Sequence, residues 1–184
     1  MKRSFDIFVS LVALLLLSPL LIIISLLIYL QDRCPVFFKQ QRFGLGGSLF
    51  YIIKFRTMVP DAEKRGPYFT GDNDSRITFL GKFLRKTSLD ELPQLFNVLR
   101  GDMSLVGPRP DVVEQRSLYN EKEWKVRCSV RPGITGLAQA TLRSQATIEE
   151  RKSMDLQYVK NKSFLLDLKI ILITLKQIIT KGGN

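Results

Sequence analysis

The chain has 184 residues, of which 45% are hydrophobic, and its 28 Lys and Arg against 17 Asp and Glu give a net charge of +11. It contains no histidine, which excludes Ser-His and Cys-His catalytic pairs and histidine metal ligands. The two cysteines, Cys34 and Cys128, have no metal-binding spacing and are typical of reduced thiols in a cytosolic environment. Any chemistry must therefore use carboxylates, lysines, arginines, hydroxyls or a hard metal ion.

The first segment is almost continuously apolar from Ile7 to Leu30. As one helix it would measure roughly 36 Å, enough to cross a bilayer core of about 30 Å. Ser18-Pro19 lies at its midpoint, and proline there predicts a bend. A straight span would leave the first basic residues on the side opposite the basic body, against the positive-inside tendency. A kinked spanning helix and a helix that enters and leaves on one face both remain open. We expect a membrane anchor over residues 1–33 and a separate domain over residues 34–184.

The body begins with two segments rich in β-branched and aromatic residues, Val36–Gln41 and Leu49–Thr57. A glycine-rich linker joins them, which predicts a β-hairpin. Lys54 and Arg56 would share one face of its second strand. Residues 59–76 are polar and contain Pro and Gly, so they are either a mobile lid or an ordinary surface loop.

The rest of the body predicts helices. Residues 79–86 place phenylalanines and leucines on one face and basic residues on the other, which fits a helix on an anionic membrane surface or an ordinary packed helix. Leucines recur at helical spacing among lysines over residues 165–181, a stretch too short and too charged to span a membrane, so this helix is interfacial or core-packed. The predicted fold is mainly α with a small β-hairpin.

The segment Ser88-Leu89-Asp90-Glu91-Leu92-Pro93-Gln94 allows two interpretations. Ser88 and Glu91 have the spacing of a capping box, and Pro93 is tolerated in a first helical turn. Alternatively, the amides of a helix start would keep Asp90 ionised as a nucleophile beside a bound phosphate. The adjacent carboxylates of Asp90 and Glu91 could also hold Mg²⁺, which prefers oxygen ligands and bridging phosphates.

Two further segments place arginines in turns. In Gly107-Pro108-Arg109-Pro110 the flanking prolines hold the Arg109 backbone extended, which suits a guanidinium directed at a phosphate. Arg131 precedes a second glycine-punctuated turn. A purely structural turn is the alternative for both.

Five motifs in this order carry a family resemblance over nearly the whole chain. The chain is similar to the bacterial sugar transferases, specifically the small monotopic phosphoglycosyl transferases. The motifs are Ser18-Pro19, Lys54-Phe55-Arg56-Thr57-Met58, Ser88 to Gln94, Gly107-Pro108-Arg109-Pro110 and Arg131-Pro132-Gly133-Ile134-Thr135-Gly136.

The resemblance implies an enzyme that transfers a phosphosugar from a UDP-sugar to polyprenol (undecaprenyl) phosphate and releases UMP. It implies that Asp90 attacks the β-phosphate to form a covalent aspartyl phosphosugar, and that Glu91 shapes the site and helps hold Mg²⁺. It also implies a re-entrant anchor bent at Ser18 and Pro19, with interfacial helices around a cytoplasmic catalytic domain over residues 34–184. A phosphate acceptor is largely a dianion at neutral pH, so the reaction needs no histidine base.

The resemblance also assigns substrate and phosphate contacts. The candidate positions are Lys54, Arg56, Arg85, Pro108, Arg109, Arg131 and Arg143. Around Arg143 the sequence departs from many relatives, because Ala140-Thr141-Leu142 replaces their Val-Asn-Gly. Arg143 keeps the basic position, but the Asn-Gly turn of those relatives is absent.

The expected location is the cytoplasmic face of a bacterial inner membrane, where the partners would be the UDP-sugar, polyprenol phosphate and membrane lipids. Homodimer formation is left open. The main alternative is a non-enzymatic membrane tether that docks acidic partners on its basic surface. Nucleic acid is not expected as a partner, because the sequence has no recognisable reading motif.

Overall fold

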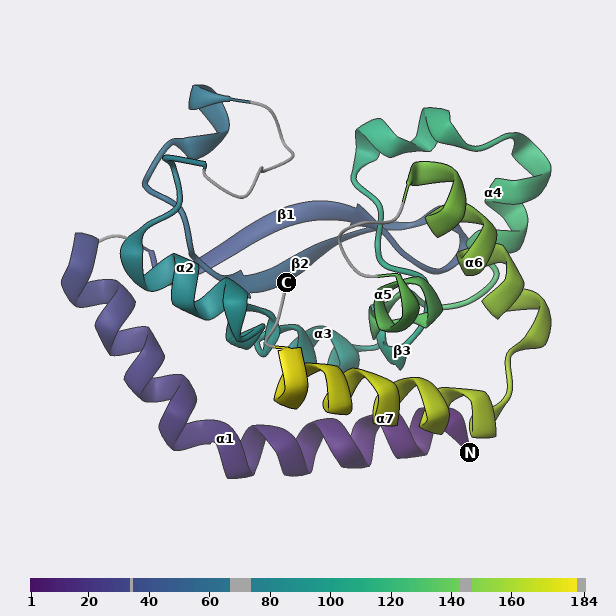
Figure 1. Ribbon diagram of the computed structural model, residues 1–184, viewed down its shortest axis with the longest axis horizontal. Helices are drawn as coiled ribbons and strands as arrows, with labels where there is room; N and C mark the ends of the chain where they lie inside the picture. Colours follow the sequence, from purple (N-terminus) through teal and green to yellow (C-terminus); the bar gives the residue numbers. More distant parts are fainter. Residues whose placement is uncertain (34, 67–73, 143–146, 182–184) are drawn as a thin grey trace.

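The computed structural model describes residues 1–33, 35–66, 74–142 and 147–181. Over these residues the chain is mostly helical with two small two-stranded sheets, so the predicted helical fold with a β-hairpin is confirmed. Figure 1 shows these elements: α1 (Lys2–Asp32), β1 (Phe37–Phe43), β2 (Leu49–Phe55), α2 (Phe79–Lys86), α3 (Gln94–Arg100), β3 (Ser104–Val106), α4 (Glu121–Arg127), β4 (Gly133–Thr135), α5 (Leu137–Thr141), α6 (Ile148–Asn161) and α7 (Phe164–Lys181).

Helix α1 is continuous through Pro19 and changes direction about halfway along its length (Figure 1). Pro19 has no N–H to donate to the carbonyl of Leu15, four residues earlier. The Ser18 hydroxyl donates to this carbonyl instead, at 2.8 Å. The sequence predicted a bend at this place. The second half of α1 packs Ile24 and Ile28 against Phe55 of β2 and Leu84 of α2.

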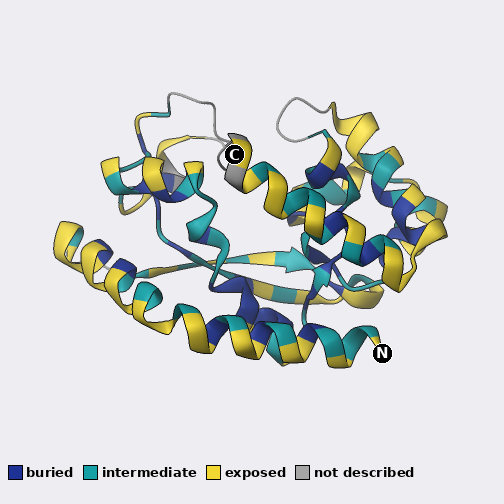
Figure 2. Cartoon of the chain, turned by 60° about the horizontal axis from the view of Figure 1, so that its bottom comes forward, coloured by how far each residue is buried: buried dark blue, intermediate teal, exposed yellow. Residues whose placement is uncertain are grey.

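Both ends of α1 are joined to the body of the protein. The Lys2 ammonium lies 2.5 Å from the Asp167 carboxylate at the start of α7, and Arg56 after β2 lies 3.3 Å from Asp32 at the other end. Between these ends α1 exposes a stripe of large apolar side chains (Figure 2). Only 17% of its most apolar 18 residues is buried, although its length and composition would allow it to cross a membrane. This exposed stripe indicates membrane association.

The predicted hairpin forms from β1 and β2, which pair antiparallel from Phe37–Phe55 to Phe43–Leu49. Helix α3 packs against β2 through Val98, which contacts Ile52 and Met103 in a buried cluster. The fully buried Asn97 amide completes this packing, because it donates to Tyr51 O at 2.8 Å and accepts from Ile53 N at 3.0 Å. A side chain of α3 thus satisfies backbone groups of β2 that β1 does not pair.

A second sheet pairs β3 with β4 in parallel, with Ser104 opposite Gly133 and Val106 opposite Thr135. The two backbones approach closely where this sheet ends: a Cβ at Gly133 would lie 2.1 Å from Gly107 N, which only glycine avoids. Helices α5, α6 and α7 cover this sheet around one buried cluster of apolar residues. Its members are Val106, Ala140, Tyr158, Val159 and Ile170.

Helices α2 and α7 each bury only part of the apolar face that the sequence predicts. In α2, Leu84 is buried, but Phe79 and Phe83 are 93% and 56% exposed, so the phenylalanines and leucines do not share one environment. In α7, Ile170 is fully buried, whereas Leu165 and Leu172 of the leucine repeat are 77% and 66% exposed. Each helix therefore buries one part of its apolar side chains and leaves another part exposed.

The polar loop over residues 59–76 is closed at its base. Met58 bridges to Ile77, and Val59 N donates to Arg76 O at 2.9 Å. Arg76 also pairs with Asp74 at 2.6 Å. Residues 67–73, on which a lid would depend, lie outside the described residues.

Candidate active site

Three charged side chains from distant parts of the chain meet around one carboxylate oxygen. Lys54 Nζ, near the end of β2, lies 2.6 Å from Glu91 Oε1. Arg109 Nη2, in the loop after β3, donates to the same oxygen at 3.0 Å. Glu91 itself lies in the 3₁₀ turn Leu89–Glu91, between α2 and α3. The structure thus brings together two predicted phosphate contacts and one predicted catalytic residue.

Asp90 lies in the same 3₁₀ turn and is 9% exposed. Lys54, Arg85 and Arg109 are close enough to act on its charge. Within the described part of the chain, however, no hydrogen-bond donor or ion-pair partner engages its carboxylate. A buried carboxylate near cations that do not bond to it is available to bond to another molecule.

The two adjacent carboxylates differ in their affinity for protons. Burial raises the pKa of Asp90 to about 6, against the opposing field of Lys54. Burial also acts to raise the pKa of Glu91, but the charges and hydrogen bonds of Lys54 and Arg109 outweigh it, and this pKa falls to about 2. At neutral pH Glu91 is therefore permanently ionised in an ion-pair network, whereas Asp90 is an ionised but more basic carboxylate. Divergent carboxylates of this kind are common where one has a chemical role.

The capping-box interpretation of Ser88 and Glu91 is wrong. Ser88 has φ = 57°, in the left-handed region, and its side chain caps no amide. Helix α3 begins only at Gln94, after Pro93, and Glu91 points to Lys54 and Arg109 instead. The strained backbone at Ser88 places Asp90 and Glu91 in the turn before α3, and backbone strain of this kind is common at functional sites.

The loop that carries Arg109 is held by hydrogen bonds to four consecutive carbonyls. Pro108 O accepts from Gly133 N at 2.9 Å, and Asp111 O accepts from Phe43 N at 3.0 Å. Between them, Arg109 O accepts from Arg127 Nη2 at 2.5 Å and Pro110 O from Arg42 Nη1 at 3.0 Å. The prolines restrict the backbone, and these donors fix it against β1, α4 and β4. The Arg109 side chain is thereby held towards Glu91.

Arg127 is itself enclosed by two carboxylates. Its Nη1 lies 2.8 Å from Asp111 Oδ2 and its Nη2 lies 3.2 Å from Asp155 Oδ2, with 4% of the Arg127 side chain exposed. The ring of Tyr119 lies under the guanidinium, with 5.1 Å between Arg127 Cζ and the ring centroid. Burial raises the pKa of Asp155 to about 6, against the field of Arg127. This cluster joins α4 and α6 to the Arg109 loop.

The other predicted phosphate contacts are distributed more widely. Arg85 on α2 donates through Nε to the Thr57 hydroxyl at 2.9 Å and contributes to the field at Asp90. Arg56 pairs with Asp32 of α1. Arg131 lies apart from the Glu91 network, since its Nε donates to Gly101 O at 2.8 Å. Arg143 lies outside the described residues.

Sequence reasoning missed Asn97, Arg42, Arg127 and Asp155, which position the site. Asn97 left one signal, a polar residue inside the apolar run Leu95–Leu99. The others look like surface charges, because isolated charged residues on short helices and strands are usually solvated. Only the pairing of distant segments shows that Arg127 and Asp155 are buried together.

The carboxylates fit a hard divalent ion. Among the described residues, no group of three or more Asp, Glu or Cys side chains could hold a metal ion. Mg²⁺ commonly uses one or two carboxylates and takes its other ligands from water and substrate phosphates. Asp90, whose carboxylate accepts no hydrogen bond from the described residues, could hold such an ion together with Glu91.

Comparison with known proteins agrees with this geometry. The family model described as "Bacterial sugar transferase" matches residues 1–181. The uncharacterized sugar transferase EpsL of Bacillus subtilis (strain 168) is 42% identical over 100% of this chain and 89% of its own length.

Two longer relatives carry more specific names. The UDP-N-acetylgalactosamine-undecaprenyl-phosphate N-acetylgalactosaminephosphotransferase of Aeromonas hydrophila is 42% identical over 99% of this chain and 44% of its own length. The UDP-glucose:undecaprenyl-phosphate glucose-1-phosphate transferase of Klebsiella pneumoniae is 43% identical over 94% of this chain and 39% of its own length. The chain therefore belongs to the bacterial sugar transferase family, and the prediction of a phosphoglycosyl transferase is confirmed.

Proposed function

We propose that the protein transfers a phosphosugar from a UDP-sugar to undecaprenyl phosphate, through a covalent intermediate on Asp90. The observation that carries this proposal is the Asp90 carboxylate, which no described donor engages although three cationic side chains act on it. The names of the Aeromonas and Klebsiella relatives support a UDP-sugar donor and an undecaprenyl-phosphate acceptor.

In the first step, an Asp90 oxygen attacks the β-phosphorus of the UDP-sugar. A new oxygen–phosphorus bond forms, the bond from that phosphorus to the bridging oxygen breaks, and UMP leaves with the bonding electrons. Asp90 is suited to this attack because its raised pKa of about 6 leaves it ionised at neutral pH while making it more basic than an ordinary aspartate.

In the second step, a phosphate oxygen of undecaprenyl phosphate attacks the same phosphorus. The bond to Asp90 breaks, which restores the carboxylate and yields undecaprenyl diphosphate sugar. The acceptor phosphate has a second pKa of about 6 and needs no base to become a nucleophile.

The main barrier is repulsion between anionic reactants. Lys54 and Arg109, held in place by Glu91, provide positive charge beside the attacking oxygen, and Arg85 adds to the field. Mg²⁺ held by Asp90, Glu91 and the diphosphate would neutralise further negative charge. Glu91 acts chiefly by orienting two cations.

The proposed location is the cytoplasmic face of a bacterial inner membrane, with α1 entering and leaving on one face. The contacts of both α1 ends with the body support this topology. The product would begin a lipid-linked polysaccharide or glycoconjugate.

The test is to incubate the protein with a panel of UDP-sugars and Mg²⁺ without acceptor and to measure its intact mass. We expect UMP release of about one equivalent and a mass gain equal to one phosphosugar, located on the peptide that contains Asp90. Addition of undecaprenyl phosphate should remove the adduct and restore turnover.

The matched controls are Asp90→Asn, which should form no adduct, and Glu149→Gln, which removes one exposed carboxylate from α6 and should behave as the native protein. An adduct that persists in Asp90→Asn would refute the assignment of the nucleophile. Transfer from donor to acceptor with no protein-linked species would refute the two-step reaction.

A further inference from the structure

A cavity of about 380 Å³ lies away from the carboxylate pair, between the start of α1, strand β3 and the α6–α7 junction. Its lining contains neither Asp90, Glu91, Lys54 nor Arg109. The volume is within the range of small-ligand sites, which are about 300–1,000 Å³. Nothing in the transfer reaction uses this cavity.

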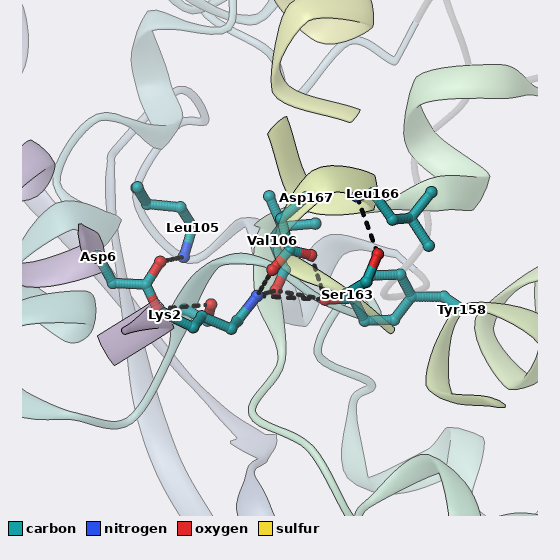
Figure 3. Close-up of polar contacts among 9 residues, drawn as sticks. Lys2, Asp6, Leu105, Val106, Tyr158, Ser163, Leu166 and Asp167 are labelled. Carbon is teal, nitrogen blue, oxygen red and sulfur yellow. Dashed lines mark hydrogen bonds and ion pairs between the residues drawn. The ribbon is translucent and has the colours of Figure 1, made fainter. Parts of the chain in front are cut away.

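The acidic groups in the cavity wall are satisfied within the protein. Asp6 accepts from the Ser104 hydroxyl at 2.8 Å and from Leu105 N at 3.3 Å. Asp167 accepts from Lys2 at 2.5 Å and from the Tyr158 hydroxyl at 2.7 Å. Figure 3 shows Lys2 and Tyr158 converging on Asp167 while Asp6 points to the β3 backbone. Each of these carboxylates therefore has hydrogen-bond donors within the protein, and Lys2 is paired with Asp167.

Three other cations of the wall have no carboxylate partner in the described part of the chain. Arg3 donates to Val98 O at 2.6 Å and to Leu99 O at 3.0 Å. Arg131 uses only its Nε, on Gly101 O. These carbonyls orient the two guanidinium groups but carry no net charge. Lys162, at the α6–α7 junction, is exposed and makes no hydrogen bond or ion pair with the described residues. The cavity thus carries uncompensated positive charge.

An aromatic side chain lies where helices α1 and α7 border the cavity. Phe164, at the start of α7, lines the cavity and is 40% exposed. Phe5 and Phe164 join the starts of these helices, with ring centroids 5.2 Å apart. Helix α1 is apolar enough to lie in a membrane, and the charged residues at its start line the cavity. This arrangement places the cavity beside the lipid headgroups. Basic groups beside an exposed aromatic side chain fit a ligand with an anionic head and hydrocarbon tails.

We propose that this cavity binds the phosphodiester headgroup of an anionic membrane phospholipid. The guanidinium groups of Arg3 and Arg131 and the ammonium of Lys162 would contact the phosphate, and the acyl chains would lie along Phe164. The assignment is to a resident lipid and not to the acceptor substrate, because the lining shares no residue with the Asp90–Glu91 site.

The test measures binding of water-soluble dihexanoyl phosphatidylglycerol to the full chain in neutral detergent by titration calorimetry. The key variant is Lys162→Glu, which reverses an exposed charge that has no partner in the described chain and so should leave folding intact. We expect affinity for this lipid to fall about tenfold, which corresponds to about 1.4 kcal/mol. The matched control is Lys160→Glu, which makes the same charge change two residues away on an exposed position outside the cavity and should alter affinity less than twofold.

Three further arms separate the sources of anionic phosphate. Dihexanoyl phosphatidylcholine should bind at least about tenfold more weakly than phosphatidylglycerol, since its headgroup is neutral overall. Farnesyl phosphate and inorganic phosphate should not compete for the site at equal concentration. Equal losses in Lys162→Glu and Lys160→Glu would show general surface attraction and overturn the proposal. Tighter, Lys162-dependent binding of farnesyl phosphate would assign the cavity to the acceptor, and equal binding of inorganic phosphate would remove the lipid assignment.

Discussion

At the scale of single residues, ionisation of Asp90 destabilises the folded protein, whereas ionisation of its neighbour Glu91 stabilises it. The folded protein holds the pKa of Asp90 above its ordinary value, so it binds the proton more tightly than the unfolded chain does. It holds the pKa of Glu91 below its ordinary value, so ionisation of Glu91 favours folding. Two amide substitutions at adjacent positions should therefore change stability in opposite directions.

Asp90→Asn should stabilise the protein at neutral pH while abolishing turnover. A shift from 3.8 to about 6 corresponds to at most about 3 kcal/mol of unfavourable charge burial. This cost is absent below about pH 4, grows as pH rises to about 6, and is complete above it. The gain in unfolding free energy, measured by urea denaturation in detergent, should therefore be greatest at pH 7.5 and disappear near pH 4. A destabilised Asp90→Asn at pH 7.5 would contradict the account of this carboxylate.

Glu91→Gln should destabilise the protein, because it leaves Lys54 and Arg109 without their shared counter-charge. Removal of one partner from a largely buried pair costs about 3 kcal/mol. The native contribution is complete above the unfolded pKa of about 4.3 and is lost as pH falls towards about 2. The difference between native protein and Glu91→Gln in urea denaturation should thus be large at pH 7 and small near pH 2.5. A constant difference over this range would show that the ion pairs are not its cause.

At the scale of elements, the Arg109 loop depends on helices α4 and α6 through Arg127. Arg127→Lys keeps the charge but cannot bond to Asp111, Asp155 and Arg109 O with one rigid fork. We expect kcat to fall at least about tenfold at a temperature where the variant is still folded, because a small displacement of a positioned cation is costly.

The readout that separates positioning from general destabilisation is the adduct on Asp90. Its rate of formation per folded molecule should fall in Arg127→Lys, and the exposed control Lys122→Arg should leave it unchanged. A normal rate of adduct formation in folded Arg127→Lys would show that α4 and α6 do not position the loop.

The elements that the sequence predicted correctly are those formed by local signals. The hairpin has aromatic and β-branched residues on both sides of a glycine-rich linker. Helix α2 has both its helical period and Thr78 as N-cap, accepting from Gly81 N. The parallel pairing of β3 with β4 joins residues 104 and 133 and leaves no local periodicity in three-residue strands. The Ser88 cap failed because tertiary contacts of Glu91 with Lys54 and Arg109 outweighed a local capping preference.

The candidate site was predictable in part for the same reason. Motif order identified Asp90, Glu91, Lys54 and Arg109, and the structure places the last three within one ion-pair network and Asp90 beside it. The donors that hold the Arg109 loop were not predictable, because each donates to a backbone carbonyl. Every residue has such a carbonyl, so the amino-acid type does not reveal the contact. Contacts of that kind follow only from the fold.

At the scale of the whole molecule, the attachment of both ends of α1 to one body predicts that both ends lie on the same side of a membrane. Ser4→Cys and Gln31→Cys place thiols near opposite ends of the helix, both on exposed positions. In intact cells both should be protected from a membrane-impermeant maleimide, and both should react after permeabilisation. A native-sequence control accounts for Cys34 and Cys128. Labelling of one end alone in intact cells would show that the helix spans the membrane.

The same double attachment ties the apolar helix to the domain that carries the two carboxylates. In the proposed topology, the carboxylates would therefore stay at a fixed distance from the hydrocarbon. The proposed acceptor, which is confined to the bilayer, would then reach them without leaving the membrane. Its encounter with the enzyme would be a two-dimensional search, limited by lateral diffusion within one leaflet.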